Sequence, residues 1–220
     1  MARTDTLGNF LTDVAEAIRT KKGTSETIQA SQFDTEIANL PSGSDLDWSA
    51  IGYDSTPQSI VDGYNYAKEI YDSWDSSVTS LDSKYSRNTK LVYFPLVDTS
   101  NITTMEYTFN YCTRLKEIAL INTSNVTSLR GAFTLCNQLT YIPVLNTSKL
   151  GTMKDAFNNV INLNDNALDN ILQMCINATS YTGTKTLSAI GISSTTYPVS
   201  RIETLPHYQD FINAGWTIGY

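Results

Sequence analysis

Few side chains in this 220-residue sequence could catalyse a reaction. It has one histidine, His207, so any Ser/His or Cys/His arrangement and the commonest metal sites depend on that residue. Neither Gly-x-Gly-x-x-Gly nor Gly-x-x-x-x-Gly-Lys occurs, and nothing else in the sequence predicts nucleotide binding. The carboxylates that glycoside cleavage would need stand at unrelated phases of an internal repeat: Asp98, Glu106, Glu117 and Asp155. The sequence therefore predicts a protein that is not an enzyme, with no catalytic residue and no cofactor.

Two other groups of residues have the chemistry of ligands. Four oxygen-bearing side chains lie close together in the sequence: Asn164, Asp165, Asn166 and Asp169. They lack the glycine and the distal glutamate of a calcium loop, so helix capping is favoured and no metal site is predicted. Three cysteines cannot form a complete disulfide framework. Cys112 and Cys136 hold equivalent repeat positions, where packed free thiols are favoured and a bridge between the two is the alternative.

The charge of the chain excludes some partners. Fifteen Lys and Arg against 22 Asp and Glu give a net charge of −7, the wrong sign for neutralising a phosphate backbone. The sequence holds no run of about 18 apolar residues, and charged residues occur throughout its first 30 positions. We therefore expect no nucleic-acid partner, no membrane span and no secretory signal.

A 24-residue period sets the architecture between residues 91 and 162. Matching columns are Leu91, Leu115 and Leu139; Phe94, Ile118 and Ile142; Leu96, Leu120 and Val144; Met105, Leu129 and Met153; Phe109, Phe133 and Phe157; Cys112, Cys136 and Val160. An Asx-Thr-Ser triplet recurs at one phase, starting at Asp98, Asn122 and Asn146. Each unit is predicted to form a short strand, a polar turn and a short helix with one apolar face. Such units bury their apolar edges only by stacking.

The period also limits the stack and suggests a binding face. Residues 76–90 match the columns weakly and are predicted to form a degenerate first coil or a cap, and residues 185–220 a C-terminal cap. If the strand columns at Leu96, Leu120 and Val144 point inward, the intervening positions point outward. These positions supply the candidate binding residues Tyr93, Lys116, Glu117 and Tyr141. A sugar or a protein side chain could stack on these tyrosines, and a plain solvated sheet face is the alternative.

The best copy of the repeat runs from Asn122 to Leu129 as Asn-Thr-Ser-Asn-Val-Thr-Ser-Leu, followed by Phe133 and Cys136. It resembles the bacterial-surface-antigen class of leucine-rich repeats. The columns and this resemblance together predict an α/β fold class: a short leucine-rich-repeat solenoid with a 24-residue period. An N-terminal helical module, predicted from the residues before the repeats, precedes it. Repeats of this class serve in cell-surface adhesion and as display modules, so the resemblance does not identify a ligand.

The N-terminal segment is predicted to be a helical hairpin. Leu7, Leu11, Val14 and Ile18 form an apolar stripe at steps of 4, 3 and 4, and Gly23 stands where this helix would end. A second helix over residues 31–40 ends at a Pro-Ser-Gly-Ser sequence. About 40 residues are too few to bury a core alone, so the hairpin should dock on the repeats or pair with copies of itself.

The stretch from Leu11 to Thr24, with Phe33 to Ile37, is similar to an N-terminal module of tail, fibre and other virion proteins of bacteriophages. This resemblance implies attachment to a phage particle, with other virion proteins of the capsid or tail as partners. It also implies a head or tail fibre on the outer surface of the virion. Fibres of this type are often trimers, so the stripe from Leu7 to Ile18 is the candidate oligomerisation surface of a homotrimer.

A third helix is predicted between the hairpin and the repeats. Thr56 and Pro57 suit its start, and the apolar stripe comprises Ile60, Tyr64, Ala67, Tyr71 and Trp74. The stripe either covers the first coil of the stack or forms a seam between protein copies.

These observations together give a domain plan and a function. The plan has a helical attachment module at 1–44, a linker and capping helix at 45–75, a solenoid at 76–184 and a cap at 185–220. The predicted function is a non-enzymatic virion fibre protein that displays the repeats for adhesion to a host cell-surface glycan or protein. A bacterial cell-surface adhesin is the main alternative, and a polysaccharide depolymerase is a weaker one.

Overall fold

The computed structural model describes residues 57–219. The chain divides into a unit of residues 1–61 and a unit of residues 62–220, and the second unit contains the repeats. The predicted hairpin, with its stripe of Leu7, Leu11, Val14 and Ile18, lies outside the described residues. The predicted boundary at residue 44 lies outside them too.

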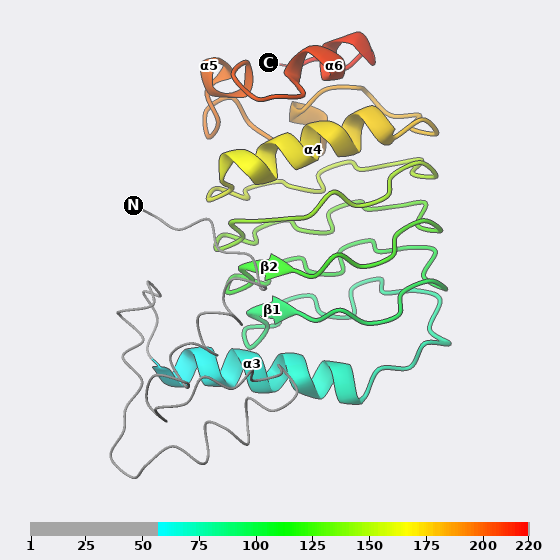
Figure 1. Cartoon of the computed structure of the whole chain (residues 1–220), viewed down its shortest axis with the longest axis vertical. Helices are drawn as coiled ribbons and strands as arrows, with labels where there is room; N and C mark the ends of the chain where they lie inside the picture. The colour runs from blue at the N-terminus through cyan, green and yellow to red at the C-terminus, as the bar shows by residue number, and fades with distance from the viewer. Residues whose placement is uncertain (1–56, 220) are drawn as a thin grey trace, which may run out of the picture. The chain divides into compact units, whose positions relative to one another are not determined.

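The described residues begin with a helix, continue as a stack of chain turns and end in a group of helices (Figure 1). In chain order the elements are α3 (Pro57–Asp72), β1 (Tyr93–Phe94), β2 (Glu117–Ile118), α4 (Asp165–Asn177), the 3-10 helix η2 (Ser188–Ile190), α5 (Val199–Ile202) and α6 (Tyr208–Asn213). β1 and β2 pair in parallel, and residues 24 apart lie opposite each other. Isolated parallel bridges extend this spacing from Ser80 through Thr104 and Ser128 to Thr152.

The face of α3 toward the stack is apolar. Ala67 and Ile70 are buried, and Trp74, just beyond the helix, meets Phe94 edge-on with ring centroids 6.2 Å apart. The three residues follow one helical face, at steps of 3 and 4. These contacts fit the capping role predicted for this helix. Tyr71 departs from its predicted place in the stripe and is 61% exposed, because Ile70 takes the inward position one residue earlier.

Side-chain hydrogen bonds join α3 to the first coil. Asn88 Nδ2 donates to the hydroxyl oxygen of Tyr66 at 2.6 Å, and Trp74 Nε1 donates to the carbonyl oxygen of Asp98 at 2.7 Å. Each bond satisfies a polar group beside an apolar contact, and so fixes the position of the helix on the coil.

One side of the stack is made of turns, at residues 79–88, 103–112, 127–136 and 151–160; we call it the turn layer. In each of the first three segments, four alternate N–H groups donate to the next coil at 2.7–3.1 Å, and one coil shows the repeating set: Met105 to Ser128, Tyr107 to Arg130, Phe109 to Ala132 and Tyr111 to Thr134. The N–H groups between them close local turns, as Thr108 does to Met105. The backbone of the turn layer is therefore bonded both within and between coils.

The turn layer replaces the short helix that the spacing of Met105, Phe109 and Cys112 predicted. That prediction is wrong, because left-handed backbone recurs at two positions of each coil with φ between 53° and 62°. One column comprises Ser83, Tyr107, Gly131 and Asp155, and the other Arg87, Tyr111, Leu135 and Asn159. A left-handed residue reverses the local turn, so the chain zigzags and cannot continue as an α-helix. The zigzag directs side chains into the core at the same sequence spacing as a helix would. The residues predicted to be buried are therefore buried in both conformations.

The recurring Asx-Thr-Ser turn is confirmed. The side-chain oxygens of Asp98, Asn122 and Asn146 each accept from the N–H two residues later, at 3.0–3.1 Å. A threonine ladder accompanies these turns, since Thr99 and Thr123 donate their hydroxyls to backbone carbonyls of the next coil at 2.8 and 2.9 Å. Each ladder bond satisfies a backbone carbonyl that the turn leaves without a local partner.

In the column of Leu96, Leu120 and Val144, the first two do not point inward as predicted, whereas Val144 is partly buried against the core. Leu96 and Leu120 are 62% and 64% exposed, and the next residues, Val97 and Ile121, are buried instead. The strands end at Phe94 and Ile118, and the N–H of Ile121 donates to the carbonyl of Ala119 at 2.9 Å. This three-residue turn directs Leu120 outward and breaks the alternation that an extended strand would keep.

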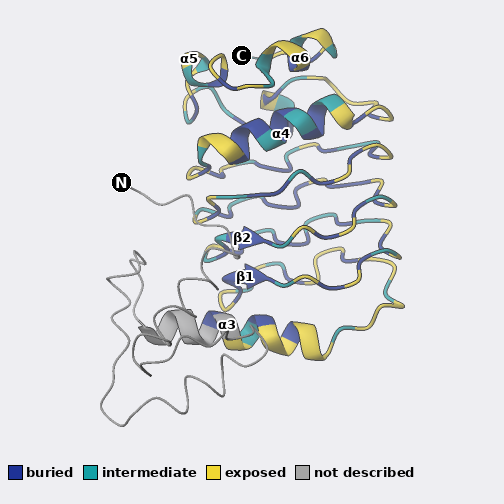
Figure 2. Ribbon diagram, in the orientation of Figure 1, coloured by how far each residue is buried: buried dark blue, intermediate teal, exposed yellow. Residues whose placement is uncertain are grey.

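The core runs the length of the stack, and its buried residues lie inside the coils (Figure 2). The predicted phenylalanine column is confirmed: Phe109, Phe133 and Phe157 are fully buried and stack with centroid distances of 5.4 and 5.5 Å. Tyr85 extends the column below Phe109 at 5.9 Å. Ring stacking and apolar burial thus act on the same side chains in successive coils.

The stack continues beyond the last sequence repeat. The N–H groups of Asp155 and Phe157 donate to the carbonyls of Ala189 and Ile190, which lie 34 and 33 residues later instead of 23. The added length contains α4. A further layer follows, because Leu187 donates to Thr217 at 2.9 Å. Residues 187–190, predicted as part of a cap, therefore act as another coil in the turn layer.

Candidate functional site

The residues predicted to bind a ligand form one stretch of the strand side. Tyr93 lies opposite Glu117 in the β1–β2 pair, and Tyr141 follows one coil later. The outward orientation predicted for Tyr93 and Glu117 is wrong, since each is only 4% exposed. Both residues of each short strand are buried, so the assumption of one buried and one solvated face does not hold. Lys116 and Tyr141 are half-buried.

Burial and charge act together on Tyr93. Burial raises the pKa of Tyr93 well above its usual range, and the nearby Glu117 carboxylate raises it further. The phenol therefore keeps its proton at neutral pH and does not act as a base. The two side chains form a buried polar pair, and the structure gives no open tyrosine platform at this position.

His207 lies beside a carboxylate at the start of α6. Its Nδ1 is 2.7 Å from Asp169 Oδ2, and its backbone N–H donates to Asp169 Oδ1 at 2.9 Å. Gln173 Nε2 lies 3.0 Å from His207 Nδ1 and 3.1 Å from His207 Nε2. Since Asp169 and Gln173 belong to α4, these contacts fasten α6 to α4 and suit a packed cap.

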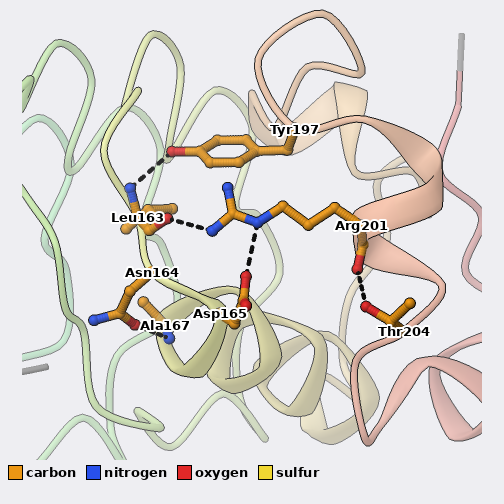
Figure 3. Close-up of polar contacts among 7 residues, drawn as sticks. All are labelled: Leu163, Asn164, Asp165, Ala167, Tyr197, Arg201 and Thr204. Atoms are coloured by element: carbon orange, nitrogen blue, oxygen red, sulfur yellow. Dashed lines mark hydrogen bonds and ion pairs between the residues drawn. The ribbon is translucent and has the colours of Figure 1, made fainter. Parts of the chain in front are cut away.

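The oxygen-bearing residues at the start of α4 cap and anchor this helix (Figure 3). Asn164 Oδ1 accepts from the N–H of Ala167 at 2.8 Å, which confirms the capping interpretation. Asp165 pairs with Arg201 Nε at 2.7 Å. Asn164, Asp165 and Asp169 therefore take part in separate structural contacts.

Arg201 and Tyr197 complete this cluster from the C-terminal segment (Figure 3). Arg201 Nη2 donates to the carbonyl of Leu163 at 3.0 Å, and its guanidinium lies over the Tyr197 ring at 5.4 Å. The Tyr197 hydroxyl accepts from the N–H of Leu163 at 2.9 Å and donates to the carbonyl of Val160 at 2.8 Å. These bonds satisfy backbone groups where the coil turns into α4.

The comparison with protein-family models places the repeats in a family. The model described as "Mycoplasma protein of unknown function, DUF285" matches residues 58–171. The chain belongs to this family. Comparisons with curated proteins and with solved structures gave no significant match.

The DUF285 match spans α3, the coils and the first half of α4. It therefore covers the candidate binding residues and the start of the C-terminal cluster. In the described part of the DUF285 chain, no three His, Cys, Asp or Glu side chains gather as a metal site would require. None of the helices between residues 57 and 219 has the length and apolar character needed to cross a membrane.

The cysteines of this DUF285 protein are buried free thiols. Cys112 Sγ donates to the carbonyl of Tyr85 at 3.0 Å, and Cys136 Sγ donates to that of Phe109 at 3.1 Å. Burial raises the pKa of Cys112 to about 11 and that of Cys136 well above its usual value. Since the thiolate is the reactive form, both positions suit packing better than redox chemistry.

Stability is expected to fall in alkaline solution. Burial raises the pKa of Cys112 to about 11 and that of Tyr85 to about 12, whereas unfolded chains ionise these groups near about 8.5 and 10. The folded state binds these protons more tightly, so this contribution is fully present below the unfolded pKa and is lost as pH rises through the folded values. Urea titrations from about pH 7 to pH 10.5 should show the unfolding free energy decreasing above about pH 8.5.

The Cys112→Ala variant provides the control for this prediction. It should show a weaker pH dependence than the parent chain, because one of the titrating groups is gone. An unfolding free energy that stays constant or rises up to pH 10.5 would contradict the assignment.

Proposed function

We propose that this protein is a non-enzymatic structural component of a bacteriophage particle, a head or tail fibre that displays a leucine-rich-repeat solenoid. Two features support the proposal. Residues 11–24 and 33–37 resemble a virion attachment module, and the backbone bonds between the coils of residues 79–158 join residues 23–25 apart. The stacking is the main support for a display role. In a chain held by coil-to-coil bonds, each layer exposes residues at the same positions of the repeat.

We propose that the displayed coils adhere to the surface of the host cell. A host-surface glycan or protein would be held by weak contacts, and several copies on one particle would raise the avidity. The exposed residues of the coils include many Ser, Thr and Asn, whose hydroxyl and amide groups can bond to such a ligand.

The proposal includes a homotrimer held by the N-terminal stripe. Light scattering on the full chain at micromolar concentration is expected to give three times the mass of one chain. Leu11→Glu should dissociate the trimer, because it places a charge in the apolar seam. Thr12→Glu adds the same charge beside the stripe and should leave the trimer intact. A monomeric parent chain would contradict this part of the proposal.

Location is the decisive test of the function. Immunogold electron microscopy, with an antibody against the full chain, would be applied to phage particles and bacterial cells from the culture that makes the protein. Label on the outer surface of the particles is expected. Label confined to the cell surface would overturn the virion role.

The family match favours a second candidate. Its description refers to Mycoplasma, a bacterium, which fits a bacterial protein better than a phage protein, and a bacterial cell-surface adhesin built on the same repeats is the alternative of that kind. The labelling experiment separates the two candidates, since they place the same coils on different surfaces.

A further inference from the structure

We propose that two tyrosines of the turn layer, Tyr107 and Tyr111, form a glycan-binding platform. The inference rests on the adhesion role proposed above and assigns that role to a surface other than the strand side. Its ligand class is a chain of hexose rings, which offers C–H faces for stacking on aromatic rings and hydroxyls around the edge.

Both tyrosines occupy backbone positions that disfavour them. Their φ values are +53° and +59°, a region that large side chains rarely adopt. Two coils later the same columns hold Asp155 and Asn159, residue types that tolerate left-handed backbone. Stability alone would favour such residues at Tyr107 and Tyr111 too. Bulky side chains also stand at Arg87 and Leu135 in the Tyr111 column, so it is the partly exposed rings, together with this backbone, that point to a role outside folding.

Arginines from the neighbouring coils hold the two rings. The Arg87 guanidinium lies over the Tyr111 ring at 4.8 Å, and that of Arg130 lies over the Tyr107 ring at 5.9 Å. Gly131 leaves room for the Tyr107 ring, because a Cβ at this position would overlap it. The platform thus takes residues from three successive coils, and cation–π contacts orient the rings before any ligand arrives.

One ring remains accessible on this surface. Tyr111 is 41% exposed although Arg87 lies over it, so the rest of its ring is open to a ligand. Tyr107 is partly exposed in the same coil, while Met105 and Phe109 on either side of it point into the core. Both tyrosines are therefore partly accessible on the turn layer of one coil.

The surroundings of the tyrosines suit sugar hydroxyls. The guanidinium groups of Arg87 and Arg130, which lie over the rings, supply several N–H donors. Thr113, two residues after Tyr111, is exposed, and its hydroxyl can donate or accept. A protein hot spot would instead centre on a fully desolvated pocket. These features favour a glycan over a protein partner.

The test measures binding of the full chain to immobilised gastric mucin by biolayer interferometry. Tyr107→Asn and Tyr111→Asn remove the rings and introduce a residue that suits the left-handed backbone. Each variant is expected to bind mucin about tenfold more weakly and to keep or raise its melting temperature. Arg87→Gln should weaken binding too, because it leaves the Tyr111 ring without its cation. Tyr71→Asn, at an exposed tyrosine of α3, is the matched control and should bind like the parent.

Periodate oxidation of the mucin separates the two classes of partner, because it cleaves sugar diols and leaves the peptide bonds intact. Loss of binding after oxidation is expected. Binding that survives oxidation would overturn the glycan in favour of a protein partner. Parent-like binding by Tyr111→Asn, or no binding of the parent to mucin, would overturn the platform.

The two proposals can fail separately. Labelled particles without mucin binding would remove only the platform. Mucin binding with label confined to bacterial cells would keep the platform and remove the virion role.

Discussion

Replacing Phe133 with alanine is expected to lower the free energy of unfolding by about 3–5 kcal/mol. Phe133 is fully buried between Phe109 and Phe157, with ring centroids 5.4 and 5.5 Å away. The substitution removes a whole ring from the middle of the column. Coil-to-coil hydrogen bonds fix the spacing on both sides, so the cavity can close only in part. Urea titration followed by circular dichroism gives the measurement.

Leu120→Ala is the control for this prediction. Leu120 is also an apolar residue of a repeat column, but it is 64% exposed, so its loss should change stability by less than about 0.5 kcal/mol. A loss below about 1 kcal/mol for Phe133→Ala would contradict the buried column.

Replacing Gly191 with alanine is expected to destabilise the chain by about 2–5 kcal/mol. Gly191 ends η2 with φ +95°, where a side chain is strained. A Cβ there would also lie 2.5 Å from Asn158 Cα and 2.8 Å from the carbonyl carbon of Phe157. These are backbone atoms of the preceding coil, so no side-chain rotation can relieve the overlap. Relief would require η2 to separate from the turn layer that it extends.

Gly215→Ala separates the two costs. Gly215 has φ +82°, and a Cβ there would meet no atom within 4 Å. Its substitution should therefore cost only the backbone strain, about 1–2 kcal/mol. Melting curves of the two variants should differ clearly, with Gly191→Ala the less stable. Equal losses would show that η2 does not lie tightly against Asn158.

The sequence predicts the contents of the core well, because the 24-residue period is a property of side chains. Phe109, Phe133 and Phe157 were assigned to one column by phase alone, and they stack in the structure. The Asx turns at Asp98, Asn122 and Asn146 were equally predictable from the sequence, because an Asx side chain can accept a hydrogen bond from the N–H two residues later.

Backbone conformation is less visible in the sequence. Met105, Phe109 and Cys112 have a helical spacing, and a zigzag of turns buries the same residues. Gly131 and Asn159 were the available signal for the turns, because both residue types favour left-handed backbone. On the strand side, the alternation was extended past Ile118, although the strand ends there.

The candidate site was the least predictable part. Tyr93 and Glu117 were placed outside by the alternation of a half-buried strand, yet both strand faces are covered. Tyr107 and Tyr111 carry no sequence signal by themselves, since their importance comes from φ and from arginines in other coils. The continuation of the stack at Ala189 was hidden as well, because α4 lengthens the period at that point.

The same bonds that hold the coils together also determine how the chain would yield to force. Each coil is tied to the next at the same positions of the turn layer. Tension between an anchored N-terminus and a bound tip would therefore release coils one at a time, and not rupture the whole stack at once. Each step would free 24 residues, about 80 Å of extended chain. A stack that opens in this way would lengthen under load and dissipate energy at each step, while its remaining coils stay folded.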